Sequence, residues 1–101
     1  MKQHDDANEY KVHVLVCTNE KAPGKPCCRL VGGQELFFKL KEKLKAENLY
    51  DTHWITRTGC LDHCNLVGPT VVIQRPGGTD EWYSEVTEAD FETIWKKITS
   101  R

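Results

Sequence analysis

The residues of this 101-residue chain best suited to chemistry are five cysteines in two groups. Cys17, Cys27 and Cys28 form the first group, and Cys60 and Cys64 form the second. An odd number leaves one thiol over in a scaffold built on disulfides. The first residues have no apolar core of the kind a secretory signal carries, so we expect a reducing cytoplasm, where clustered cysteines more often bind metal or do redox chemistry. Packing as small buried hydrophobes is the weaker interpretation, because most of these cysteines lie among loop residues.

Two metal centres compete for these thiolates, a zinc ion and an iron–sulfur cluster. Structural zinc sites usually pair their cysteines with two to four residues between them. Here ten residues separate Cys17 from Cys28, and three separate Cys60 from Cys64. The wide first gap fits a zinc knuckle poorly, whereas a cluster of two irons, with two thiolates on each, accepts loops from opposite ends. Spacing alone leaves both centres open.

Hydrophobic patterns predict the elements that must position the cysteines, in the order β-α-β-β-β-α. A run that is apolar on both faces predicts a central strand over 10–17, and apolar residues at helical spacing predict a helix over 34–47. Residues 52–58 are rich in β-branched and aromatic types and predict a second strand. The remaining elements are a strand at 71–73, a turn at 75–80, a strand at 81–86 and a helix that begins after Thr87.

This order places the two cysteine groups at one end of the sheet. The first two strands are joined through a helix, which makes neighbouring strands parallel with a right-handed crossover. Parallel strands end on the same side, where ligands of open α/β sheets collect. Cys17 ends the first strand, and Cys60 follows the second strand by two residues. Cys28 and Cys64 lie on the two loops and can fold back towards the same point.

Composition excludes several other classes of protein. With 39% hydrophobic and 29% charged residues, the chain is typical of a soluble globular protein, and we expect one domain over 10–101 after a flexible segment, 1–9. No apolar stretch approaches the roughly 20 residues of a membrane helix. A net charge of −1 gives no strong attraction to nucleic acid. A thioredoxin-type dithiol, two cysteines two residues apart at a helix N-terminus, is missing, and we expect no enzymatic activity.

The cysteines also stand in short motifs that follow one another along the chain. These are 16–19 (Val-Cys-Thr-Asn), Cys28 with Gly32 four residues on, 58–60 (Thr-Gly-Cys), Cys64, and 68–69 (Gly-Pro) before the third strand. In these motifs the chain resembles the thioredoxin-like 2Fe-2S ferredoxins, small bacterial electron carriers, over nearly its whole length. The resemblance implies a thioredoxin-like α/β fold with a four-stranded mixed sheet, electron transfer and frequently a homodimer. It also implies one 2Fe-2S cluster with the ligands Cys17, Cys28, Cys60 and Cys64.

The sequence therefore predicts a cytoplasmic one-electron carrier that shuttles electrons between two redox partner proteins, a reductase and an acceptor. The alternative is a structural zinc-binding module that recognises a partner. Cys27 is expected to be a bystander thiol, because adjacent side chains in an extended loop diverge. His63, directly before Cys64, is expected to be a solvent-facing imidazole, and a Rieske-type ligand there is the weaker interpretation.

Two further expectations concern tryptophans and acidic residues. Trp82 and Trp95 are expected in the core. Acidic residues could steer a basic redox partner, although solvated surface charge is the plainer interpretation for each of them alone. These acidic residues are Glu20, Asp62, Glu81 and Glu85.

Overall fold

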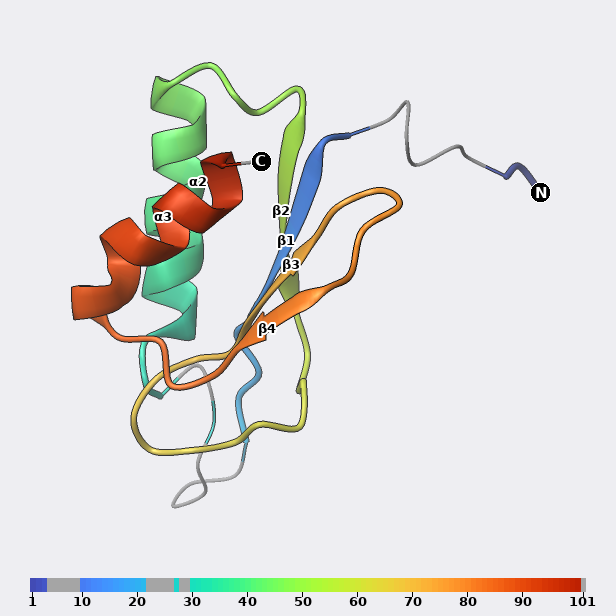
Figure 1. Ribbon diagram of the computed structural model, residues 1–101. Helices are drawn as coiled ribbons and strands as arrows, with labels where there is room; N and C mark the ends of the chain where they lie inside the picture. Colours follow the sequence, from blue (N-terminus) through green and yellow to red (C-terminus); the bar gives the residue numbers. More distant parts are fainter. Residues whose placement is uncertain (4–9, 22–26, 28–29, 101) are drawn as a thin grey trace.

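The fold is built on a four-stranded mixed sheet with the strand order β2-β1-β3-β4. The computed structural model describes residues 1–3, 10–21, 27 and 30–100. β1 (Val12–Cys17) is central and pairs in parallel with β2 (His53–Thr58). On its other side β1 pairs antiparallel with β3 (Val71–Gln74). The parallel pair predicted from the helical crossover is confirmed, so the carboxyl ends of β1 and β2 lie at one end of the sheet (Figure 1).

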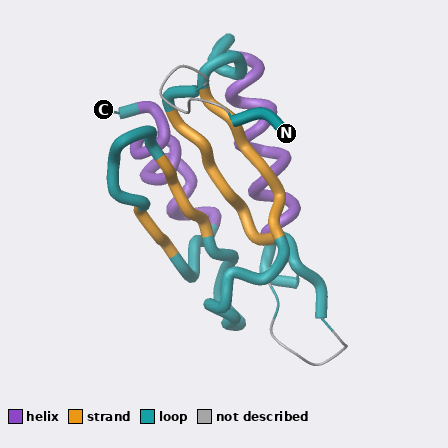
Figure 2. Tube along the Cα trace, turned by 90° about the vertical axis from the view of Figure 1, so that its right-hand side faces the viewer, coloured by secondary structure: helices purple, strands orange, loops and turns teal. Residues whose placement is uncertain are grey.

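Both helices cover the same face of this sheet (Figure 1). α2 (Gly33–Ala46) buries an apolar stripe that includes Leu40, and α3 (Phe91–Thr99) buries another that includes Ile98. These stripes pack with alternate residues of β1, of which Val14 is fully buried. Figure 2 shows the strands in front of the two helices, so no helix of the described residues covers the other face. We call it the open face.

α3 begins at the cap that the sequence predicts. The Thr87 amide and hydroxyl donate to Asp90 Oδ2 at 2.9 and 3.1 Å. Thr87 precedes a short 3-10 turn, η1 (Glu88–Asp90), and α3 follows it directly. The carboxylate therefore satisfies donors that the first turn of a helix leaves without a backbone partner.

The final strand differs from the prediction in length and in the burial of its tryptophan. β4 (Glu81–Tyr83) forms the predicted antiparallel hairpin with β3 but ends three residues before position 86. It ends there because the chain turns at Glu85, whose φ of 55° lies in the left-handed region. Trp82 is 51% exposed, so its predicted core position is wrong, whereas Trp95 is buried as predicted. Trp82 pairs with Val72 on the open face at the edge of the sheet, where no helix of the described chain packs.

The ends of the chain add little to this architecture. Residues 4–9 of the predicted flexible segment, and Arg101 at the other end, lie outside the described residues. Within the described ranges, neither helix is long and apolar enough to span a membrane.

Candidate metal centre

The described cysteine-bearing loops start side by side where β1 and β2 end. Cys17 is the last residue of β1 and pairs with Thr58, the last residue of β2. The Cys17 amide donates to the Thr70 carbonyl at 3.1 Å, and the Thr18 amide donates to the Thr58 carbonyl at 3.1 Å. These backbone bonds hold the start of the first loop against both neighbouring strands. Cys17 itself is buried, with 1% of its surface exposed.

Cys60 and Cys64, on the second loop, form a close pair of thiols. Their Sγ atoms lie 3.5 Å apart, and both residues are exposed. A tetrahedral metal ion with metal–sulfur bonds of about 2.3 Å holds two thiolates about 3.8 Å apart. The observed separation is close to that value, so this pair has the spacing needed to share one metal ion.

Two hydrogen-bond donors already point at these sulfurs. The Asp62 amide donates to Cys60 Sγ at 3.3 Å. Asp62 has a φ of 64°, and this left-handed turn lies within the short segment that brings the two cysteines together. Lys21, from the loop after β1, places its Nζ 2.6 Å from Cys64 Sγ. Donors of this kind favour negatively charged sulfur, which is the form that binds a metal.

These contacts shift the pKa values of the two thiols in opposite directions. The hydrogen bond from Lys21 lowers the pKa of Cys64, and the hydrogen bond with Cys60 lowers it further. At Cys60 the Asp62 amide lowers the pKa, but the hydrogen bond with Cys64, desolvation and the charge of Cys64 outweigh it and raise the pKa overall. The hydrogen bond to Cys64 also raises the pKa of Lys21. Of the two thiols, Cys64 is therefore the one that loses its proton more readily.

The rest of the second loop is fastened to the segment after β4. Asn65 Oδ1 accepts from the amides of Val67 and Gly68 at 2.7 and 2.8 Å. A Cβ on Gly68 would lie 2.0 Å from the Val86 carbonyl oxygen, so only glycine fits at this crossing. The Val86 amide in turn donates to the Pro69 carbonyl at 3.1 Å. The loop that carries the cysteine pair thus has a fixed base.

The predicted ligands are brought together only in part. Cys60 and Cys64 are in contact, and Cys17 lies at the same end of the sheet. Among the described residues, no group of three or more histidine, cysteine or acidic side chains is placed to hold a metal ion. Cys28, the fourth predicted ligand, lies outside the described residues. Cys27 is buried, with 5% of its surface exposed. The four-cysteine ligand set stays a prediction.

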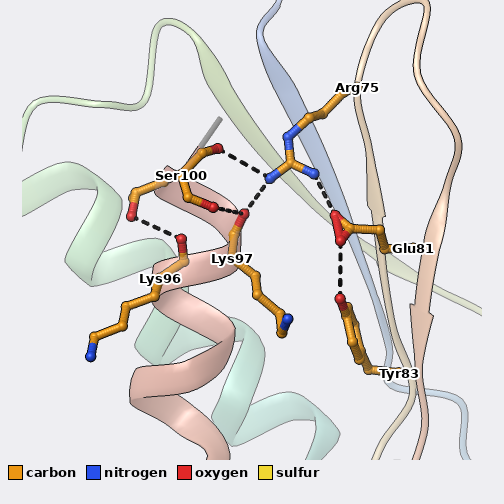
Figure 3. A network of polar contacts seen from close by, with 7 residues as sticks. Arg75, Glu81, Tyr83, Lys96, Lys97 and Ser100 are labelled. Atoms are coloured by element: carbon orange, nitrogen blue, oxygen red, sulfur yellow. Dashed lines mark hydrogen bonds and ion pairs between the residues drawn. The ribbon is translucent and has the colours of Figure 1, made fainter.

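Sequence reasoning missed two contacts near the cysteines and misjudged one acidic residue. It assigned no role to Lys21, although a lysine four residues beyond Cys17 on the same loop was the available signal. It also missed that the exposed His63 ring lies 5.8 Å from the Trp82 ring. Glu81 is a paired charge, because it accepts hydrogen bonds from Arg75 at 2.5 Å and from Tyr83 at 3.0 Å (Figure 3).

Comparisons with known proteins identify close relatives of this arrangement. No protein-family model and no curated protein matches the chain. Among solved structures, the wild-type thioredoxin-like [2Fe-2S] ferredoxin from Aquifex aeolicus is 35% identical, with a TM-score of 0.72 over 88% of this chain and 86% of that chain. Two serine variants of the same ferredoxin are each 36% identical over 85% of this chain and 84% of theirs, with TM-scores of 0.70 and 0.69. The predicted thioredoxin-like fold is thereby confirmed.

The two variants add a detail about spacing. The cysteines substituted in the two variants are four positions apart in the ferredoxin chain. Cys60 and Cys64 are also four positions apart in this chain. The close pair at the end of β2 therefore has a counterpart in spacing among the cysteines of that protein.

Proposed function

The chain belongs to the thioredoxin-like [2Fe-2S] ferredoxins, and we propose that it is a one-electron carrier rather than an enzyme. In this proposal one 2Fe-2S cluster is held by Cys17, Cys28, Cys60 and Cys64. When bound, such a cluster takes up and releases single electrons at a potential set by its surroundings.

The observation that carries the proposal is the Cys60–Cys64 pair, at 3.5 Å between sulfurs, beside the end of β1 where Cys17 lies. The Asp62 amide and the Lys21 ammonium supply donors to these sulfurs, and an anionic cluster is stabilised by such donors. A zinc-binding module would use the same pair. The likeness to a [2Fe-2S] ferredoxin over most of both chains favours iron and sulfide.

The exposure of the pair supports electron exchange at the surface. Exposed apolar side chains lie on the same loop or in contact with it: Leu66 is 71% exposed, Val67 54% and Trp82 51%. Trp82 reaches the second loop through its contact with His63. We call Leu66, Val67 and Trp82 the cysteine-loop rim. Exposed apolar residues gathered at one place are typical of a protein–protein contact, so we assign the rim to the docking of the reductase and the acceptor.

Charge around the rim supports a basic partner. Asp62 lies between the two cysteines and Glu85 follows β4, and both are exposed. Acidic side chains beside an apolar contact speed the association of a partner of opposite charge. Glu81 is omitted from this steering set because Arg75 neutralises it. A cytoplasmic location and a homodimer complete the proposal on family likeness, and light scattering of the purified protein tests the dimer.

The test of the function is the spectrum of protein purified without oxygen. A 2Fe-2S protein is red-brown, contains about two irons and two sulfides per chain, and gives an electron paramagnetic resonance signal after reduction by dithionite. A zinc protein is colourless. One zinc per chain with no sulfide would overturn the proposal.

Serine variants test the ligand assignment. Cys60→Ser and Cys64→Ser are expected to abolish or visibly shift the spectrum, and Cys17→Ser to do the same. Cys27→Ser is the matched control, because it removes a thiol from the first loop and is expected to leave the spectrum nearly unchanged. A colourless Cys27→Ser protein beside a normal Cys28→Ser protein would reverse the assignment on that loop.

A further inference from the structure

One cation from the first loop contacts a cysteine of the second. Lys21 and Cys64 are 43 positions apart in the chain, yet Lys21 Nζ lies 2.6 Å from Cys64 Sγ. The usual lysine pKa of about 10.4 makes this side chain a full cation at neutral pH. Its charge therefore stands next to a predicted cluster ligand.

Three lysines of α2 have a different kind of partner. Lys39 lies over the Phe91 ring at 4.2 Å, Lys41 over the Phe37 ring at 5.3 Å and Lys43 over the Trp95 ring at 5.2 Å. These contacts hold the three lysines on aromatic rings of the two helices. Lys21 differs from them because its partner is a sulfur.

We infer that Lys21 raises the reduction potential of the cluster by holding a positive charge against the sulfur of Cys64. This inference rests on the proposed function, since it requires Cys64 to be a cluster ligand. Lys21 is then a positioning residue, one that acts on the redox centre through a ligand and not by direct contact with iron.

The direction follows from the charge balance of reduction. One electron moves from the reductase to the cluster, no bond to the protein forms or breaks, and the cluster with its thiolates becomes more negative by one unit. A fixed cation beside a ligand sulfur stabilises the more negative state more strongly. Hydrogen bonds to sulfur and net charge are among the factors that set cluster potentials. Lys21 supplies both.

The charged neighbour that opposes this effect is Asp62. Its amide donates to Cys60 Sγ, while its carboxylate lies near the same sulfur, with Oδ1 at 3.7 Å. A negative carboxylate lowers the potential by the same reasoning that makes Lys21 raise it. The two side chains contact different sulfurs of the pair, and replacing Lys21 leaves the Asp62 carboxylate in place.

The experiment measures the midpoint potential of the cluster-loaded protein in a titration followed by its visible spectrum. Lys21→Met removes the charge and keeps the length of the side chain, and it is expected to reduce the equilibrium constant for reduction several-fold. Lys21→Arg keeps the charge and is expected to stay near the wild type. Lys45→Met is the matched control, because it removes the same charge from the exposed last turn of α2, away from the cysteines.

The outcomes separate this inference from the proposed function. A wild-type protein without the 2Fe-2S spectrum would overturn both the proposed function and the role of Lys21. A Lys21→Met protein with the full spectrum and a potential equal to that of Lys45→Met would overturn the role of Lys21 alone. If Lys21→Met does not load a cluster, Lys21→Gln takes its place, with the same lowered potential expected. Loss of the cluster in both neutral variants would assign Lys21 to cluster retention and overturn its assignment to the potential.

Discussion

The two ends of the sheet use polar side chains for different purposes. At the end away from the cysteines, Arg75 donates to Glu81 Oε1 at 2.5 Å and to the carbonyl oxygens of Lys97 and Ser100 (Figure 3). The two carbonyls belong to the C-terminus of α3, where a helix leaves acceptors without backbone partners. Arg75 thus ties the β3–β4 hairpin to α3, and its positive charge is balanced by the carboxylate of Glu81.

At the cysteine end, the polar contacts converge on sulfur. The Asp62 amide and the Lys21 ammonium donate to Cys60 and Cys64, both of which are exposed. Such donors favour anionic sulfur and prepare it for a metal centre. The comparison teaches that the polar contacts which fasten one element to another and those which prepare the sulfurs lie at opposite ends. Changes at the Arg75 end should therefore alter unfolding without altering the cluster, while changes near the cysteines should alter the cluster.

A pair of glycines, one at each end, gives the largest expected contrast. Gly68→Ala places a Cβ 2.0 Å from the Val86 carbonyl oxygen, and the backbone must shift. We expect a loss of about 3 kcal/mol in unfolding free energy, as for severe overpacking, together with a weakened cluster spectrum. Denaturant unfolding and the visible spectrum measure the two effects.

Gly77→Ala is the matched control in the opposite turn. Gly77 has a φ of 74° with open space around it, so alanine meets backbone strain of about 1–2 kcal/mol but no clash. The spectrum should stay that of the wild type. Equal losses of stability in the two variants would contradict the clash at Gly68. An altered cluster in Gly77→Ala would contradict the separation of the two ends.

Removal of Arg75 is the next largest effect. Arg75→Met breaks the pair with Glu81 and frees the carbonyl oxygens at the end of α3. Because the lost hydrogen bonds involve a charged group, we expect a decrease of about 2 kcal/mol in unfolding free energy, measured by denaturant titration. The visible spectrum and the midpoint potential should be unaltered. A potential that moved as far as in Lys21→Met would show that the two ends are not independent.

The part of this architecture that follows from the sequence is the part set by regular elements. An apolar run in β1, a helical crossover and a second strand suffice to place Cys17 and Cys60 at one end of the sheet. Parallel pairing through a crossover follows from chain geometry, whatever the loops do.

The contact between Lys21 and Cys64 could not be predicted in the same way. It joins two loops whose conformations follow no period, so no pattern in the sequence specifies which side chains meet. Trp82 was misplaced for a related reason. Hydrophobicity predicts burial, but it does not tell which face of an edge strand is left without a helix. The early end of β4 depends on a positive φ at Glu85, which this residue type seldom adopts.

A smaller effect is expected in the reactivity of the cysteine pair once the metal centre has been removed. The hydrogen bonds from Lys21 and Cys60 lower the pKa of Cys64, while the pKa of Cys60 is raised. At neutral pH more of Cys64 is thiolate, so iodoacetamide should alkylate it several-fold faster than Cys60. Mass spectrometry of the peptides after timed labelling measures the two rates. Lys21→Met should narrow the difference between the two alkylation rates. Faster labelling of Cys60 than of Cys64 in the wild type would contradict the lowered pKa of Cys64.

The smallest effect concerns pH and the pair at the other end. The hydrogen bond from Arg75 holds the pKa of Glu81 below its usual value of 4.5. A depressed carboxyl pKa contributes stability that is present above the unfolded pKa and is lost as the pH falls through the folded pKa. Glu81→Gln should therefore be less stable than the wild type at pH 7. The difference should shrink as the pH falls below 4.5 and vanish once the pH is below the depressed pKa of Glu81. Because this carboxylate is partly exposed to solvent, the difference at pH 7 should stay small. A difference that persists unchanged in acid would mean that Glu81 acts through its shape and hydrogen bonds rather than through its charge.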